Sequence, residues 1–583
     1  MATKKFINSV DRCVDECLAG VVAVNPGLQI LEGHRVIIRA DIDQVKAAGK
    51  VTILCGGGSG HEPAHAGYIG PGMLSGAIAG AVFTSPPPNS ILAAIRAVGK
   101  GNSAGTLLLI KNYTGDRLNF GIAAERAKAE GINVEMVVVS EDTALTSNDK
   151  TAGRRGLCGT ILIEKITGAL ADEGKSLEEI VEVANQAVSR MGTIGISASP
   201  CSVPGSGPSF QLGQDEMELG LGIHGEAGVR RMKISSAKET LKTMFDHLSS
   251  EASSTHLPIK SGDHVALMVN NLGGTSVLEL NIMAKEAIDY LESKHVKVDR
   301  VYCGTFMTSL EMAGATMTLL HIDDQLKRCL DASTSAPAWS KPLLQPGTTD
   351  RVTPKQMAAV CGTSSDKGTD VGSKVDAGFG QKIYKCIKSV CDVLIQSENK
   401  LNKLDTEGGD GDCGTTHRRG AEAILKSLKS AGLNVTCPYQ LVLSLAHIVE
   451  QEMGGSSGAL YSLFLSAAAL PLMQDTSSMA WFAALEKGIS AMARYGGADP
   501  GDRTMMDSFH AAQMTLKENM SKVEPLMALE LAVKATEEAA ESTATMPARA
   551  GRASYVSADR LSQPDPGAVA VAMWLKAIYQ ALV

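Results

Sequence analysis

Between about residues 34 and 323, short runs rich in β-branched and aliphatic residues alternate with amphipathic segments of helical length. The strand candidates are residues 34–40, 50–55, 105–111, 133–140, 264–270, 298–305 and 315–322. Helix candidates between them include residues 90–99, 117–130, 176–191 and 276–294. This alternation predicts an α/β architecture with largely parallel strands. Such folds bind ligands at the ends of their strands, so the loops there are the first candidates for a site.

After residue 372 the pattern changes, and we identify no strand. Helical periodicity covers residues 382–403, 421–431, 439–452, 459–472, 479–495, 508–517, 526–541 and 567–581. This predicts an all-α domain of about eight helices. The stretch from 333 to 372 is rich in Pro, Ser and Gly and predicts a flexible linker. The predicted domains are therefore residues 1–332, a linker over 333–372, and residues 373–583.

Charge and cysteine usage narrow the class of protein. The chain carries 63 acidic against 55 basic side chains, a net charge of -8, whereas nucleic-acid binding requires a basic surface. No apolar signal segment follows the N-terminus, and the longest apolar stretch, residues 459–473, is shorter than the roughly 20 residues that span a bilayer. The 12 cysteines include no CxxC pair, which favours free thiols. We expect a cytosolic enzyme with a buried helix at 459–473 and no nucleic-acid or membrane partner.

Three consecutive glycines begin the segment GGGSGHE at residues 56–62, directly after a predicted strand. Glycines permit unusual backbone conformations and close approach of a ligand. A phosphate-binding P-loop is excluded because the Lys-Ser/Thr pair is missing, while a tight turn remains an alternative. His61 to His65 also match the HExxH pattern of zinc proteases. Pro63 inside that motif disfavours the required helix, so we favour a ligand-binding loop.

Two further motifs place polar side chains in loops. KNYTGDRLNF at residues 111–120 closes a predicted strand with Lys111 and Asp116, which suggests a pocket mouth. Asp116 could equally cap the next helix. In GLGIHGEAG, residues 220–228, His224 is flanked by glycines in an open loop. An imidazole there can act as nucleophile or base near pH 7, although a structural role is an equal alternative.

Asp405, Asp410 and Asp412 lie in the glycine-rich segment DTEGGDGDCGTTH. Three carboxylates this close favour a magnesium ion, which commonly bridges carboxylates and nucleotide phosphates; the alternative is an acidic surface loop. GGSSGA at residues 454–459 opens a helix and predicts an anion site at its N-terminus. Arg503 could neutralise phosphate charge, and residues 551–555 could form a mobile cover.

Together these motifs resemble the dihydroxyacetone kinase family, in order and over nearly the whole chain. The strings GGGSGHEP, KNYTGDRLNF, GLGIHGEAG, GDGDCGTTH, GGSSGALY and GRASYV carry the resemblance. It implies a K-type domain of two α/β subdomains, then an L-type domain that is an eight-helix barrel. Fusion of both in one chain is similar to the ATP-dependent branch, and the detail is most similar to its bifunctional animal members.

For the first domain, the resemblance implies that His224 bonds covalently to a substrate carbonyl carbon. It assigns His61 and Asp116 as general acid/base residues. Its substrate-binding positions are Gly58, Ser59, Gly60, His61, Lys111 and Asp116.

For the second domain, the resemblance implies that Asp405, Asp410 and Asp412 hold Mg²⁺ on ATP. Its nucleotide-binding positions are Asp412, Cys413, Gly414, Thr415, Ser456, Ser457, Gly496, Arg503, Asp565, Pro566 and Gly567.

The resemblance also implies substrates and assembly. Dihydroxyacetone and glyceraldehyde are the expected phosphate acceptors, in a homodimer. A second expected activity splits FAD into AMP and a cyclic riboflavin phosphate, with Mn²⁺ or Co²⁺. Two alternatives stay open: a non-catalytic sensor of small carbonyl compounds, and a zinc hydrolase built on His61 and His65.

Overall fold

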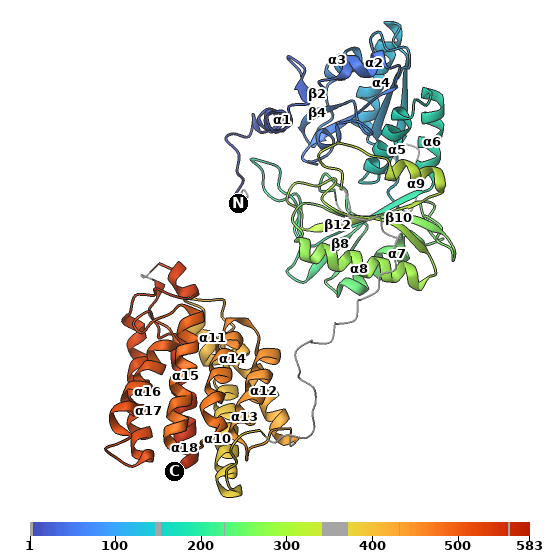
Figure 1. Cartoon of the computed structure of the whole chain (residues 1–583). Helices are drawn as coiled ribbons and strands as arrows, with labels where there is room; N and C mark the ends of the chain where they lie inside the picture. The colour runs from blue at the N-terminus through green and yellow to red at the C-terminus, as the bar shows by residue number, and fades with distance from the viewer. Residues whose placement is uncertain (1–3, 146–152, 227, 341–370, 431, 558–559) are drawn as a thin grey trace. The chain divides into compact units, whose positions relative to one another are not determined.

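The computed structural model describes residues 4–145, 153–226, 228–340, 371–430, 432–557 and 560–583. The chain forms two compact units, Met1–Lys355 and Gln356–Val583 (Figure 1). Most of the expected linker, residues 341–370, lies outside the described residues. Its first part packs on the first unit, where Thr334 donates a hydrogen bond to the Pro71 carbonyl and Trp339 is buried.

The first sheet follows the predicted alternation. Its strands lie in the order β1 (Leu28–Ile30), β2 (Val36–Arg39), β4 (Gly76–Val82), β3 (Thr52–Ser59), β5 (Thr106–Lys111) and β6 (Val134–Val139). The four strands from β4 to β6 are parallel, and β1 and β2 add an antiparallel edge. Alternate residues of β5 face opposite cores, because successive side chains of a strand point to opposite faces.

Helices cover both faces of this sheet. One face carries α2 (Ile42–Ala47), α3 (Pro88–Gly99) and α4 (Thr114–Ala129). The other carries α1 (Cys13–Val24), α5 (Thr160–Asp172) and α6 (Leu177–Ser189). The sheet is therefore buried on both sides, as its apolar central strands require.

The second sheet differs from the prediction. Its order is β11 (Lys297–Gly304), β10 (His264–Asn271), β12 (Gly314–His321), β7 (Met191–Ser197), β8 (Glu216–Leu219) and β9 (Arg230–Lys233). Only β10 and β11 pair in parallel. Largely parallel strands are thus correct for the first sheet and wrong for this one. The predicted helix 176–191 is too long at its C-terminal end. The observed helix ends at Ser189, and Met191 is the first residue of β7.

The two sheets share a continuous apolar core. α7 (Ala237–Leu248) and α8 (Val277–Ser293) pack on one face of the second sheet. The opposite face, with α9 (Asp324–Asp331), joins the core that contains α5. This packing fixes loops of both sheets next to each other in one unit.

The second unit is helical, and no strand occurs among its described residues. Its α-helices are α10 (Ala377–Gln396), α11 (Glu398–Asp405), α12 (Cys413–Lys429), α13 (Pro438–Ile448), α14 (Gly455–Ala469), α15 (Ser478–Gly496), α16 (Met505–Asn519), α17 (Pro525–Ser542) and α18 (Pro566–Leu582). One predicted helix, 382–403, is two, because the chain breaks between α10 and α11 at Ser397. The helices surround an apolar cavity of about 760 Å³.

One helical stretch of the described chain, Gly455–Met473, is long and apolar enough to cross a membrane by length and composition alone. Only 28% of its apolar window is buried, so the predicted buried helix is correct only in part. Tyr461, Phe464 and Leu465 line the cavity instead of packing fully into a core. The apolar composition therefore reflects the wall of an interior space.

Candidate functional site

The glycine segment lies where two parallel strands end. β3 continues through Gly56 to Ser59, and its neighbour β5 ends at Lys111. A Cβ atom on Gly57 would lie 2.6 Å from Lys111 Nζ and 3.5 Å from Asp116 Oδ2. Absence of a side chain at Gly57 thus leaves room for the Lys111 ammonium beside the Asp116 carboxylate.

Gly58 has a different role. A Cβ atom there would lie 2.6 Å from the backbone nitrogen of Thr84. The requirement for glycine at 58 is therefore close backbone packing within strand β3, and not the tight turn that was the alternative. The loop is also held by the connection between β11 and β12, because the Leu310 backbone N–H donates to the Gly60 carbonyl at 2.9 Å.

Three aromatic rings gather around His224. Its ring centroid lies 4.9 Å from that of His61, 5.3 Å from Phe83 and 4.6 Å from Tyr113. His61 also stacks on Phe83 at 5.2 Å. The structure thus brings His224, from the β8–β9 connection, against His61, which lies 163 positions earlier in the sequence.

Hydrogen bonds indicate which ring nitrogens are basic. His61 Nδ1 lies 2.8 Å from the Thr308 carbonyl oxygen, so Nδ1 carries the hydrogen and Nε2 the lone pair. Burial lowers the pKa of His61 well below its usual value, and the charges of His224 and Lys111 add to this. A neutral His61 with a free Nε2 lone pair is the state required of a general base.

Several buried polar atoms at this site have no hydrogen-bond partner among the described residues. They are His61 Nε2, Tyr113 Oη, Asp116 Oδ1 and Ser85 Oγ. Unpaired buried polar atoms cost free energy, so their concentration in one place indicates a polar ligand.

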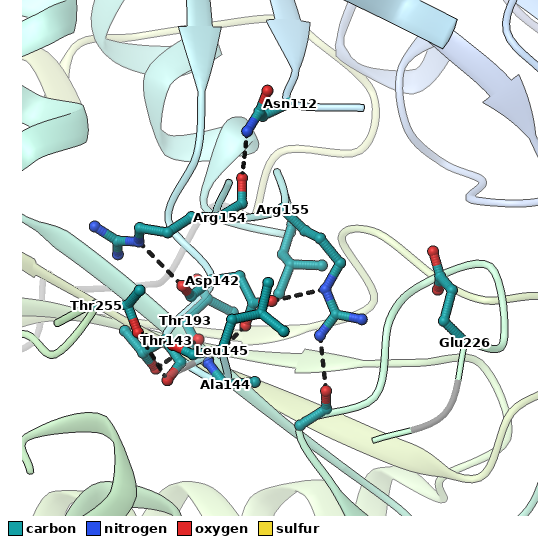
Figure 2. A network of polar contacts seen from close by, with 12 residues as sticks. Asn112, Asp142, Thr143, Ala144, Leu145, Arg154, Arg155, Thr193, Glu226 and Thr255 are labelled. Atoms are coloured by element: carbon teal, nitrogen blue, oxygen red, sulfur yellow. Dashed lines mark hydrogen bonds and ion pairs between the residues drawn. The ribbon is translucent and has the colours of Figure 1, made fainter. Parts of the chain in front are cut away.

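Glu226 orients His224. The His224 Nδ1 atom lies 3.0 Å from Glu226 Oε1, and the His224 backbone N–H donates to Oε2. Burial alone would raise the pKa of Glu226, but the His224 bond and the His224 and Arg155 charges lower it to about 2. Figure 2 shows Arg155, which donates to Asp142 Oδ2 and to the Gly220 carbonyl.

The zinc-protease alternative does not fit this geometry. Residues 61–65 form turns and not a helix. His61 bonds the Thr308 carbonyl, whereas His65 bonds Glu164 and Lys111. The two imidazoles therefore do not share one helical face, as the HExxH chemistry requires.

The second unit holds the carboxylate cluster. Asp405 ends α11, Asp412 precedes α12, and Asp410 lies in the turn between them. Ligand oxygens of all three lie within 4.8 Å of one another. Asp405 Oδ2 also accepts the backbone N–H groups of Asp412 and Cys413, which fixes the turn.

The electrostatics of this cluster fit a cation. The Arg552 guanidinium forms an ion pair with Asp410, and this bond is the main reason that the pKa of Asp410 is lowered. Burial, then the Asp410 charge, raises the pKa of Asp412. Three carboxylates that converge repel one another. This repulsion raises the pKa of one carboxyl and favours a guanidinium beside another, and a cation would relieve it. Hard oxygen ligands of this kind suit Mg²⁺.

Arg503 and Asp565 lie close enough to interact electrostatically near this cluster. Asp565 caps α18 by accepting the Ala568 N–H, and burial raises its pKa to about 6. Arg503 donates through Nη2 to the Gln563 carbonyl, while its Nε has no partner among the described residues. That free donor is suited to an anion such as phosphate.

The remaining predicted positions lie at helix ends. Cys413, Gly414 and Thr415 form the first turn of α12, and Pro566 and Gly567 the first turn of α18. Ser456 and Ser457 are in the first turn of α14, which packs on α12 through the His417–Tyr461 ring contact at 5.6 Å. Gly496 ends α15, where a Cβ atom would meet Leu460 of α14. No described contact joins Ser456, Ser457 or Gly496 to the three carboxylates.

Both units match known domain families. A Dak1 domain covers residues 19–338 and a DAK2 domain covers residues 407–580. Triokinase/FMN cyclase of Homo sapiens is 52% identical over 583 residues, with 100% of both chains covered. The chain belongs to the dihydroxyacetone kinase family. The family's dihydroxyacetone kinase of Pichia angusta is 36% identical, covering 98% of this chain and 97% of its own.

Solved structures of the family agree with this fold. The native dihydroxyacetone kinase of C. freundii matches with a TM-score of 0.67 and 33% identity over 100% of both chains. The same enzyme in complex with AMP-PNP and Mg²⁺ matches with a TM-score of 0.66, over 99% of this chain and 100% of its own. The predicted fold class, an α/β domain followed by a helical domain, is confirmed.

In this family member, our sequence analysis missed Phe83, Tyr113, Glu226 and Thr308. Tyr113 and Glu226 stand inside motifs that we quoted, so adjacency to Lys111 and His224 was an available signal. Phe83 and Thr308 come from distant loops, and no local pattern indicates that they reach His61.

Proposed function

We propose that the chain is an ATP- and Mg²⁺-dependent kinase that phosphorylates dihydroxyacetone and glyceraldehyde. The names of its relatives support this, and so does the AMP-PNP and Mg²⁺ complex of the C. freundii enzyme. The single observation that carries the proposal is the cluster of unpaired buried polar atoms beside His224.

In the proposed chemistry, His224 holds the substrate covalently. Nδ1–H donates to Glu226, so the Nε2 lone pair is available to attack a carbonyl carbon. The Nε2–C bond forms as the carbonyl π bond breaks, and the carbonyl oxygen takes up a proton from solvent. The ring releases its Nδ1 proton to solvent by way of Glu226, so the hemiaminal ends neutral. Glycerol has no carbonyl and is rejected by chemistry and not by size.

The phosphorylated hydroxyl must lose a proton. His61 Nε2 and Asp116 are the proposed acceptors, because both carry unpaired buried atoms in this site. The oxygen then attacks the γ-phosphorus, and ADP leaves. Mg²⁺ held by Asp405, Asp410 and Asp412 would neutralise phosphate charge.

A second activity is proposed from the relatives named triokinase/FMN cyclase. The nucleotide half of FAD resembles ADP, so the helical unit could bind FAD and split it into AMP and cyclic FMN with Mn²⁺ or Co²⁺. A homodimeric assembly and a cytosolic location complete the proposal.

One observation favours a different function for the first unit. A dihydroxyacetone kinase operon co-activator matches 57% of this chain with 33% identity and a TM-score of 0.52. Sensing of a carbonyl compound is therefore the second candidate. The carboxylate cluster of the helical unit argues against it, since a sensor needs no nucleotide-metal site.

An ADP-release assay with Mg-ATP tests the proposal, with dihydroxyacetone, glyceraldehyde and glycerol compared side by side. Turnover with both carbonyl compounds and none with glycerol is expected. If none of the three compounds causes ADP release, the kinase proposal is overturned. Binding of a carbonyl compound without turnover would favour the sensor function.

A further inference from the structure

A group of buried polar side chains, His65, Glu164 and Lys111, lies next to the substrate loop. His65 and Glu164 have no role in the chemistry proposed above. His65 Nδ1 lies 2.6 Å from Glu164 Oε1, and His65 Nε2 lies 3.0 Å from Lys111 Nζ. Side-chain exposure is 3% for His65 and 0% for Glu164. Lys111 is also fully buried, so water does not compensate these charges.

The directions of the hydrogen bonds among Lys111, His65 and Glu164 are fixed. Lys111 as an ammonium can only donate, so His65 Nε2 must accept. The hydrogen of the neutral imidazole is then on Nδ1 and points at Glu164. Burial lowers the pKa of His65 well below its usual value, which agrees with this neutral form.

Two other functions for the group are less consistent with its geometry. Cys55, His65 and Glu164 have the composition of a metal site or a thiol triad. However, Cys55 Sγ is 3.9 Å from His65 Nε2, whereas Lys111 Nζ is 3.0 Å from the same atom. The ammonium occupies the position that a metal ion or a thiol would need. Burial also raises the pKa of Cys55 well above its usual value.

Lys111 connects the group to the substrate site. Its Nζ atom, 3.0 Å from His65 Nε2, would also lie 2.6 Å from a Cβ atom on Gly57, a position that is 3.5 Å from Asp116 Oδ2. We propose that His65 and Glu164 are positioning residues that hold the Lys111 ammonium at the floor of the substrate site, and that ionisation of Glu164 strengthens this hold. The inference rests on the proposed kinase function and extends it to two residues that do not touch substrate.

Glu164 is the member of the group that changes charge near neutral pH. Burial raises its pKa to about 8, while the Cys55 bond and the Lys111 charge act in the opposite direction. Its Oε2 atom has no partner among the described residues and can carry the proton. The other titratable groups around Glu164 and Lys111 are Cys55, His61, Tyr68, Asp116 and Cys158.

The test compares the pH dependence of kcat/KM for dihydroxyacetone in the full-length wild type, Glu164→Gln and Glu164→Asp. Gln keeps the shape and can accept from His65 but cannot ionise. We expect the ratio of wild-type to Glu164→Gln kcat/KM to rise about tenfold between pH 7 and pH 9. Glu164→Asp keeps the charge, so the ratio of its kcat/KM to that of Glu164→Gln should also rise between pH 7 and pH 9. A constant ratio in a folded Glu164→Gln variant would overturn the proposal.

Thr167→Val is the matched control. Thr167 lies on the same helix α5, is equally buried, does not titrate, and donates to the Ile163 carbonyl of its own helix. The ratio of wild-type to Thr167→Val kcat/KM should not change with pH.

A crystal structure of Glu164→Gln at pH 9 gives a readout that needs no turnover. The Lys111–His65 contact should lengthen, and an unchanged contact would count against the positioning role of His65 and Glu164. An inactive wild type would contradict the kinase proposal, whereas this structural result would still decide whether His65 and Glu164 position Lys111.

Discussion

The carboxylate of Glu226 accepts two hydrogen bonds from one residue, His224: one from the ring Nδ1 at 3.0 Å and one from the backbone N–H at 3.0 Å. This pairing fixes both the ring orientation and the tautomer of His224. Glu226 stays ionised across the working pH range, because its pKa is lowered to about 2.

Glu226→Gln should therefore weaken catalysis without unfolding the protein. The amide can accept only one of the two bonds and carries no charge. We expect kcat/KM for dihydroxyacetone to fall about 10- to 100-fold, or about 1.4–2.7 kcal/mol. Glu182→Gln on the exposed face of α6 is the control and should be unchanged. Wild-type kinetics in Glu226→Gln would contradict the orienting role.

Gly57 and Gly58 should respond differently to alanine. At Gly57 the new Cβ would meet Lys111 Nζ at 2.6 Å, so the ammonium must move and turnover should fall at least tenfold; the backbone φ of +157° also disfavours a side chain, so some stability is lost. At Gly58 the Cβ would meet the Thr84 backbone at 2.6 Å, so the unfolding free energy should fall by about 1–3 kcal/mol. Steady-state kinetics and thermal unfolding of both variants check this, and an equal loss of turnover per folded enzyme at both positions would refute it.

The contrast between these glycines shows what sequence reasoning could reach. The motif GGGSGHE predicted a special backbone, and β3 does continue through it to Ser59. It could not distinguish a glycine that makes room for Lys111 from one that packs on Thr84, because both partners are distant in sequence. The same limit applies to the second sheet. Its strand β7 follows α6 at once, and the antiparallel partner that defines it, β12, lies over 110 residues later.

Glu141 gives a prediction about stability and pH. Burial raises its pKa from 4.5 to about 7, although hydrogen bonds from Leu157 and the Arg154 charge oppose this. The folded state then holds a proton that the unfolded state has released, so stability falls as pH rises from 4.5 to 7. The shift corresponds to at most about 3 kcal/mol.

Chemical unfolding of wild type and Glu141→Gln between pH 4.5 and 8 measures this term. The wild-type free energy of unfolding, minus that of the variant, should decrease with pH up to about 7 and then level off. A difference that rises with pH, or does not change, would show that Glu141 is ionised in the folded state throughout.

The two units should be separable by point substitutions. His224 lies in the first unit and the three carboxylates in the second, so His224→Ala should abolish ADP release with dihydroxyacetone but retain FAD cleavage with Mn²⁺. Asp410→Asn should abolish both activities and lose the thermal stabilisation by Mg-ATP that binding produces. Asp410 suits this test because its described side-chain pairing is with Arg552, whereas Asp405 also holds the backbone of the turn.

Asp475→Asn is the control for the helical unit, since Asp475 accepts hydrogen bonds from Ser477 near the start of α15. It should keep both activities and the Mg-ATP stabilisation. Removal of divalent ions with a chelator should reproduce the Asp410→Asn result in the wild type. Loss of FAD cleavage in a folded His224→Ala variant would contradict the separation, because the imidazole would then be needed for chemistry assigned to the other unit. Retained turnover of dihydroxyacetone in that variant would instead remove the covalent role of His224 while leaving the nucleotide site intact.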